Sequence, residues 1–262
     1  MYRILAVVAM LAACGSPGGG GGGGGDDTPD PATVFDPSVT RVVIEIDFED
    51  GQEPFTGPIL GFGDTMDVTV TNIDRVFAGK KQLTIPRVVG AMENIGAVAD
   101  EELTSADLLA LSNAHRDLRD GTGGKSYYVL FVGGHFADGG GVRPTVLGVS
   151  LGGTGVIAMF KDVIRTTSVP AFPNVVRFVE QSTLVHELGH AIGLVGNGVE
   201  PTVDHKDTEH GAHCTNDACV MYYLNEGASD AAAFAQKYVL AGNTILFDGA
   251  CLGDVDALTG GP

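Results

Sequence analysis

Two histidines and a glutamate lie close together in the sequence, and their residue types and spacing would allow them to take part in a reaction. They are His186, Glu187 and His190, and Gly193 follows three residues later. Residues four apart on a helix lie on the same face, so the two imidazoles can hold one metal ion. The glutamate beside the first histidine can then reach a water molecule on that metal and act as its base.

The residues around this group favour a helix that carries it. Val185, Leu188 and Ile192 form an apolar stripe that should face a core. Gly189 inside a helix costs about 1 kcal/mol relative to alanine, so we expect another backbone segment to approach closely there. Gly193 is placed to end the helix in a left-handed conformation. Two side chains hold a metal weakly, so this turn should lead to a third ligand.

Composition limits the classes of function. The chain has 262 residues, which suits one domain or a two-lobed one, and 44% hydrophobic residues, which is enough for a core. Its net charge of −18 argues against nucleic-acid partners, because phosphate binding needs clustered lysine and arginine. The same charge argues against a polybasic contact with a membrane surface.

Residues 1–14 are typical of a targeting segment. Arg3 precedes a short apolar run at 4–13, which is too short to span a bilayer. The run ends in Leu-Ala-Ala before Cys14 and resembles the lipobox of bacterial lipoproteins. That resemblance implies cleavage before Cys14 and a lipid on its sulfur. The alternative is an ordinary secretory signal, and both interpretations predict export. The lipid on Cys14 would anchor the protein to a membrane of the bacterial cell envelope, periplasmic or surface-facing.

Residues 15–38 predict a disordered tether. They include eight consecutive glycines from Gly18, followed by aspartates and prolines, and cannot bury enough apolar area to fold. We expect the folded domain at 39–262, with an upper lobe at 39–193 and a lower lobe at 194–262.

Hydrophobic periodicity predicts a sheet followed by the histidine-bearing helix. One expected strand, at 82–89, contains Pro86 and should therefore lie at the edge of the sheet or form a bulge. The expected strands are 41–48, 82–89, 127–132, 146–151 and 156–160, and the expected helices are 68–77, 104–118, 174–193, 229–240 and a short one within 247–258. A glycine turn between the last two strands indicates a hairpin.

After Gly193 the pattern becomes irregular and polar. The segment 196–220 contains candidate metal ligands, and a methionine and two tyrosines follow it. The residues of interest are His205, Asp207, His210, His213, Cys214, Cys219, Met221, Tyr222 and Tyr223.

These motifs together resemble the metzincin zinc peptidases. The H-E-x-x-H-x-x-G run matches that family, whose third histidine normally comes three residues later, but position 196 is glycine here. The run from His213 to Met221 is similar to the archaemetzincin H-C-x4-C-x-M pattern, which begins with the third ligand. An insertion of 213 − 196 = 17 residues reconciles the two patterns. Leishmanolysin-type metzincins carry a longer insertion at the same point.

The resemblance implies a fold, a cofactor and an activity. The fold would be α+β and zincin-like, with a twisted five-stranded sheet, backing and active-site helices, and a small irregular C-terminal lobe. His186, His190 and His213 would bind one catalytic zinc ion, leaving a fourth position for water. Glu187 would accept the proton of that water as it attacks a protein or peptide substrate.

Two further roles come from the same resemblance. Met221 would be the Met-turn residue beneath the metal, and its alternative is an ordinary core methionine. Tyr223 would contact the metal or the transition state, as in astacin-like and serralysin-like members, and its alternative is a core tyrosine.

The third ligand has competitors. His205 and His210 could take the place of His213, and Asp204 or Asp207 could also bind a metal. A separate hypothesis is that His205 and Asp207 organise the insertion around a second ion.

Three cysteines remain once Cys14 is lipidated. Cys214 and Cys219 could form a disulfide that fixes His213, or Cys251 could bridge one of them. The C-x-x-C that continues the archaemetzincin pattern is absent. This argues against a structural zinc held by four cysteines.

Two classes of function follow. The first is an active zinc peptidase of the cell envelope, and the second is a non-catalytic envelope lipoprotein with a structural metal site. Glu187 favours the enzyme, because a structural site has four protein ligands and no use for a neighbouring base.

Overall fold

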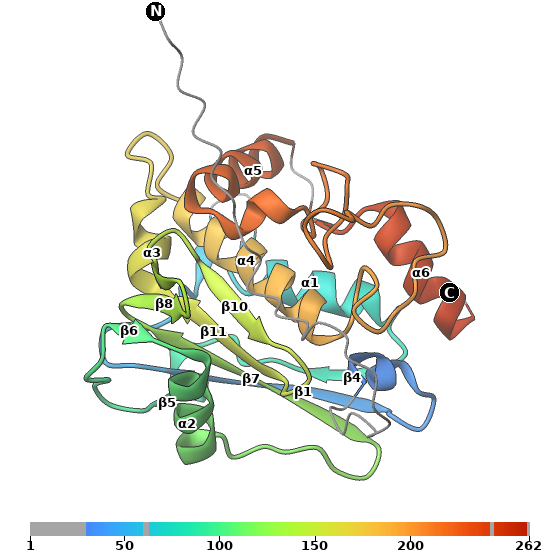
Figure 1. The fold of residues 1–262 in the computed structure, drawn as a ribbon, viewed down its shortest axis with the longest axis horizontal. Helices are drawn as coiled ribbons and strands as arrows, with labels where there is room; N and C mark the ends of the chain where they lie inside the picture. Colours follow the sequence, from blue (N-terminus) through green and yellow to red (C-terminus); the bar gives the residue numbers. More distant parts are fainter. Residues whose placement is uncertain (1–29, 60–62, 242–243, 261–262) are drawn as a thin grey trace, which may run out of the picture.

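A mixed sheet forms the centre of the molecule (Figure 1). The computed structural model describes residues 30–59, 63–241 and 244–260, so the predicted leader and Cys14 lie outside the described residues. The main sheet runs in the order β10-β11-β7-β1-β4, and β5 also pairs with β1. Its strands are β1 (Arg41–Phe48), β4 (Gln82–Thr84), β5 (Glu93–Asn94), β7 (Gly124–Val132), β10 (Gly148–Leu151) and β11 (Val156–Phe160). All pairings are parallel except that of β10 with β11.

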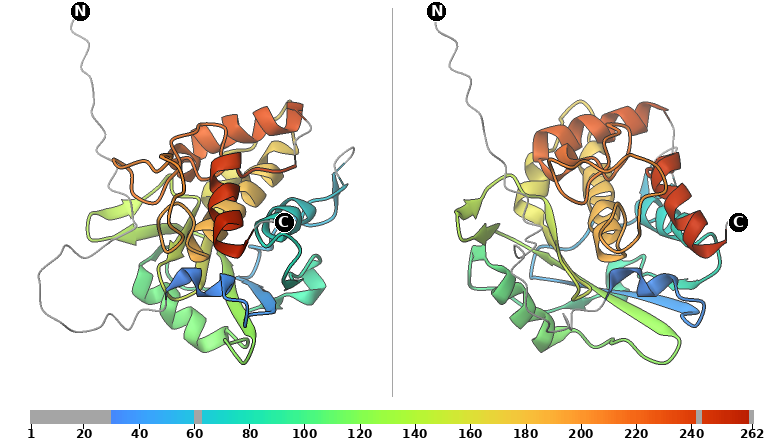
Figure 2. Two further views of the ribbon diagram at one scale, coloured as in Figure 1. Left: turned by 90° about the vertical axis from the view of Figure 1, so that its right-hand side faces the viewer. Right: turned by 45° about the vertical axis from the view of Figure 1, so that its right-hand side comes forward.

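Helices cover both faces of this sheet. The histidine-bearing helix α4 and helix α1 lie over one face, and α2 lies against the other (Figures 1 and 2). The helices are α1 (Asp67–Val76), α2 (Ser105–His115), α3 (Lys161–Thr166), α4 (Val175–Ala191), α5 (Ala228–Ala241) and α6 (Gly249–Thr259). In the described part of the chain, no helix is long and apolar enough to cross a membrane.

Shorter elements complete the fold. A two-stranded pair and a three-stranded sheet lie outside the main sheet, together with three short 3-10 turns. They are β2 (Pro58–Ile59), β3 (Gly63–Asp64), β6 (Glu102–Leu103), β8 (His135–Asp138), β9 (Gly141–Arg143), η1 (Pro31–Phe35), η2 (Val89–Ala91) and η3 (Tyr223–Glu226). The sequence patterns did not predict these elements or α3, because they are too short to show a period.

The predicted strands and helices are present, with some shifted ends. The hairpin of β10 and β11 is confirmed, and β4 is an edge strand as expected. The strand predicted at 82–89 ends at Thr84, two residues before Pro86, which has no N–H for the ladder. The helix predicted at 104–118 ends at His115, because Arg116 is extended.

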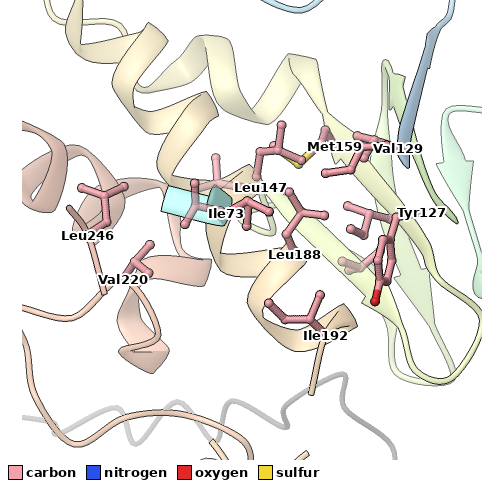
Figure 3. Packing of buried hydrophobic residues seen from close by; sticks show 14 of the residues in the cluster. Ile73, Tyr127, Val129, Leu147, Met159, Leu188, Ile192, Val220 and Leu246 are labelled. Atoms are coloured by element: carbon pink, nitrogen blue, oxygen red, sulfur yellow. The ribbon is translucent and has the colours of Figure 1, made fainter. Parts of the chain in front are cut away.

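The core lies between the sheet and α4 (Figure 3). Leu188 and Ile192 point from α4 toward the sheet, where Tyr127 and Met159 lie. All four side chains are buried. The stripe predicted from periodicity is therefore the face that packs on the sheet, and the histidines project elsewhere.

The folded part begins earlier than predicted. Val34 and Phe35 are buried, and the Phe35 ring lies 5.6 Å from that of Phe77. Asp30 caps the turn η1 by accepting from the N–H of Ala32. The boundary expected at 38 was wrong, because two apolar residues in a proline- and aspartate-rich stretch show no periodicity.

A buried ion pair holds the first half of α4. Lys161 and Glu180 are fully buried and form a salt bridge. The N–H of Phe55 donates to the Glu180 carboxylate at 2.6 Å, and the Lys161 ammonium lies 3.6 Å from the Phe55 ring centre. Burial lowers the pKa of Lys161 and raises that of Glu180, so each charge depends on its partner.

Removing one member of this pair should destabilise the fold strongly. We expect Glu180→Ala to lower the free energy of unfolding by about 3–5 kcal/mol, because it leaves a buried ammonium unpaired. The double substitution of Lys161→Met with Glu180→Leu should recover most of that loss. Chemical denaturation measures both. The control is Lys125→Ala at the solvent-accessible Asp120–Lys125 pair, which should change stability by about 1 kcal/mol or less. An equally small effect at Glu180 would contradict this interpretation.

Candidate metal centre

Helix α4 buries the two candidate metal ligands and the candidate base in the interior of the protein. His186, Glu187 and His190 are all at most 3% exposed, although polar side chains are normally outside. The helix ends at Ala191, and Gly193 has the predicted left-handed conformation just beyond it, with a φ of +91°. The carbonyl of His190 accepts from the N–H of Gly193 and the amide of Asn197, which closes the last turn.

The chain returns after the insertion to place His213 beside the pair. Its ring centre lies 5.3 Å from that of His186 and 4.8 Å from that of His190. The backbone on both sides is fixed, because the His213 carbonyl accepts from Asp207 at 2.7 Å and the next N–H donates to Met221 at 2.8 Å. Three imidazoles from two distant segments therefore converge.

Glu226 joins the three histidines and was not predicted. Its Oε1 lies 2.9 Å from Nε2 of His213, 3.8 Å from Nε2 of His186 and 4.0 Å from Nε2 of His190. The four ligand atoms lie within 4.8 Å of one another. Glu226 ends the turn η3, and no motif spacing relates it to the H-E-x-x-H run.

Hydrogen bonds fix which nitrogens face the centre of this group. Nδ1 of His186 donates to the carbonyl of Val220 at 2.6 Å, and Nδ1 of His213 donates to the carbonyl of His210 at 2.6 Å. A carbonyl only accepts, so in a neutral ring Nε2 carries a lone pair. Nε2 of His213 and Oε1 of Glu226 are then two acceptors 2.9 Å apart. A proton or a metal cation between them satisfies both, so the residues fit a metal ion.

The protonation states also fit a metal site. Burial, with help from the two neighbouring histidines, holds the pKa of His190 well below its usual value, so the ring is neutral and can bind a metal. Burial opposes ionisation of Glu226, but its contacts with His186 and His213 outweigh this and lower its pKa. Burial and the nearby charge of Glu226 raise the pKa of Glu187 well above its usual value. A neutral His190, an ionised Glu226 and the inward-facing Nε2 atoms of His186 and His213 suit one zinc ion.

Met221 packs against α4 at the glycine between the two histidines. A Cβ atom added to Gly189 would lie 2.4 Å from the sulfur of Met221, which is fully buried. The close approach expected at this glycine is therefore real, but a side chain makes it rather than a backbone segment.

The other candidate ligands lie outside this group. His205 contacts Asp254 at 2.6 Å, and His210 contacts Asp207 at 2.7 Å. The ring of His210 stacks on Tyr223 with centres 3.7 Å apart. The structure thus pairs Tyr223 with His210.

The three cysteines of the described chain form no disulfide bond. Cys214, Cys219 and Cys251 are all free and buried. Neither the possible disulfide between Cys214 and Cys219 nor the alternative bridge to Cys251 is formed in the structure. The sulfurs of Cys219 and Cys251 lie 3.5 Å apart, which is well beyond the length of a disulfide bond.

Alanine at position 189 should destabilise the protein, although alanine is normally the better helix former by about 1 kcal/mol. We expect Gly189→Ala to lower the free energy of unfolding because its Cβ displaces Met221, and to be much less harmful in a Met221→Ala background. Chemical denaturation of the four proteins measures the coupling. Gly253→Ala in α6, where a Cβ meets nothing within 4 Å, is the control and should not destabilise. Equal effects of Gly189→Ala in both backgrounds would contradict the contact.

Comparison with known proteins gives one likeness. No family model matches the chain, and no curated protein matches it. Among solved structures, a zinc-dependent peptidase from Methanocorpusculum labreanum is similar with a TM-score of 0.45 and 13% sequence identity, covering 82% of this chain and 99% of that one. A likeness at this level does not assign a function to the chain.

Proposed function

We propose that this protein is a zinc-dependent peptidase. The observation that carries the proposal is a second carboxylate, that of Glu187, which is buried beside three converging imidazoles but lies outside the group of metal-binding atoms. A site that only held the fold together would have no use for this carboxylate. Its burial is unfavourable for folding, which is typical of a residue kept for chemistry.

The chain's own residues supply the parts of a hydrolytic mechanism. A zinc ion held by His186, His190 and His213 would supply a Lewis acid and would lower the pKa of a water molecule. The hydrogen bonds of His186 and His213 to backbone carbonyls orient those two rings. The Glu187 carboxylate would accept a proton from the attacking water, and its raised pKa favours holding that proton until it passes to the leaving amine.

The backbone around Glu187 holds it in place. The backbone of Ser150 on β10 hydrogen-bonds to its carboxylate. A Cβ at Gly148 would lie 3.0 Å from Cγ of Glu187, so this glycine leaves room for the side chain. The edge strand β10 therefore positions the base from the sheet side.

Glu226 favours a second candidate function. Together with the histidines it makes four protein ligands, which is the usual number in a structural zinc site. This supports a non-catalytic protein whose metal stabilises the fold. The peptidase proposal requires Glu226 to withdraw when substrate binds. Its side chain is 33% exposed, whereas the three histidines are at most 3% exposed, so it lies on the solvent side of the group.

The peptidase subfamily, the role of Met221 and the membrane anchor are also proposals. We infer a metzincin of archaemetzincin type, with Met221 as the Met-turn residue, on the H-C-x4-C-x-M run and on the packing of Met221 under α4. Protein or peptide substrates follow from this type. The lipid anchor on Cys14 and the location in the cell envelope rest on the sequence alone, as does any contact of Tyr223 with the transition state.

Replacing the proposed base should abolish hydrolysis and spare the metal. We expect Glu187→Gln to reduce casein or peptide cleavage by about 10²–10⁴-fold, because general acid–base catalysis contributes that much. Zinc content, measured on the same protein, should not change. The control is Glu209→Gln on the exposed surface. Undiminished cleavage by Glu187→Gln would refute the mechanism.

The two candidate functions predict opposite results at position 226. For a peptidase, Glu226→Ala should keep one zinc at the three histidines and cleave at least as fast as the unaltered protein. For a structural site, the same change should weaken zinc binding and lower the melting temperature, with no cleavage in either protein. Zinc content, thermal unfolding and peptide cleavage together decide between them.

A further inference from the structure

One buried amide holds the carbonyl group that orients the first imidazole of the histidine group. Asn225 lies in the turn η3 and is 5% exposed. Its Nδ2 donates to the carbonyl of Val220 at 2.9 Å and to that of Cys219 at 3.1 Å. Nδ1 of His186 donates to the same carbonyl of Val220 at 2.6 Å. Side chains from η3 and from α4 therefore meet on one oxygen atom.

The partners of this amide fix its orientation. Carbonyl oxygens only accept, so the part of the Asn225 side chain that faces them must be its NH2 group. A buried amide is unfavourable for folding without hydrogen bonds, and the two carbonyls supply them. The Val220 carbonyl in turn has two lone pairs, one for Asn225 and one for His186. Its hydrogen-bonding capacity is fully used in the protein interior.

The turn η3 does not need the Asn225 side chain to close. Backbone bonds close it, because the N–H of Tyr222 donates to the carbonyl of Cys219 at 3.1 Å and the N–H of Asn225 donates to the carbonyl of Tyr222 at 3.0 Å. The side chain instead contacts the peptide groups on both sides of Val220. The N–H of Val220 donates to the carbonyl of Leu246 at 2.9 Å, and the two residues lie side by side in Figure 3. The Asn225 amide thus fixes the Val220 segment rather than its own turn.

We propose that Asn225 is a positioning residue for the metal centre, and that it acts on His186 through the Val220 carbonyl. The inference rests on the metal site of the proposed function, whether that site is catalytic or structural. The bond from Nδ1 to a carbonyl sets the tautomer and the orientation of a metal-binding imidazole. A carbonyl that accepts from two different elements gives this bond one direction. Without the amide, the carbonyl has one donor and the Val220 peptide can turn.

A second amide near the site offers a matched control. Nδ2 of Asn197 donates to the carbonyl of His190 at 2.9 Å, the same distance as in the bond from Asn225 to Val220. This carbonyl also accepts from the N–H of Gly193 at the end of α4. In the described part of the chain it accepts from no imidazole. Loss of the Asn197 amide should therefore affect the end of the helix and leave the rings in place.

The experiment compares zinc affinity and cobalt spectra between isosteric variants of the full chain. Asn225→Asp turns a carboxylate oxygen toward two carbonyls, and it should weaken zinc binding by about 10–100-fold, the usual effect of a change behind a metal-binding histidine. Cobalt bound in place of zinc should show shifted visible absorption bands, because the His186 ring changes its orientation. Asn197→Asp should change neither quantity. Competition with a chelator measures the affinity, and far-ultraviolet circular dichroism checks that each metal-free variant is folded.

Two further measurements apply if Asn225→Asp does not fold. Asn225→Ser removes the same donors without adding a charge, and it should weaken zinc binding in the same direction. In the unaltered protein, the side-chain amide protons of Asn225 and the Nδ1 proton of His186 should exchange slowly with solvent by NMR, and both signals should shift when zinc is added. The amide of the exposed Asn113 should exchange fast and should not shift.

The contrary results separate this inference from the proposed function. Zinc binding by Asn225→Asp or Asn225→Ser that equals that of the unaltered protein, with the same cobalt spectrum, would overturn the positioning role and leave the metal centre intact. An equal loss of affinity in Asn197→Asp would overturn it too, as would Asn225 amide protons that exchange as fast as those of Asn113. Failure of the unaltered protein to bind zinc at the three histidines would overturn both this inference and the proposed function.

Discussion

The structure depends on one constraint: imidazole nitrogens in the protein interior direct their lone pairs toward one another. His186 and His213 both use Nδ1 to donate to carbonyls, which directs both Nε2 atoms inward. The nearest oxygen to Nε2 of His213 belongs to Glu226 and is also an acceptor. Such a group is unfavourable unless a cation lies within it, so metal binding and folding of the lower segment should be linked.

The rest of the fold holds α4 against this group. Its apolar stripe packs on the sheet, and the Lys161–Glu180 pair fixes its first half (Figure 3). Gly189 admits Met221 from the segment that carries His213. The helix is thus held on one side by the sheet and on the other by the loop that supplies the third imidazole. Small errors in its position would separate the histidines.

Local patterns predicted α4, its apolar stripe and the central strands, because one helix or strand places those residues. The preference for His213 came from its motif with Cys214 and Met221, and the structure places this histidine beside the pair. Glu226 could not be predicted, since the turn that carries it has no period and no motif. The same is true of Cys251 beside His205, which meet only when α6 docks on the insertion.

The disulfide that the sequence allowed between Cys214 and Cys219 is not formed in the structure, for a related reason. Five residues between two cysteines allow a ring, but the fold spreads Cys214 and Cys219 around a centre that also receives α6. Similarly, the turn at Pro31–Phe35 is folded only because Phe77 and the segment after Gly193 lie next to it. In each case the deciding contact joins residues far apart in the sequence.

A crystal structure of the full chain with anomalous scattering measured at the zinc edge tests the central claim most directly. The account predicts a peak about 2.0–2.1 Å from Nε2 of each of His186, His190 and His213. A peak held by His186 and His190 with His205 or His210 would change the third ligand. Fully ordered histidines with no zinc peak between them would contradict the account.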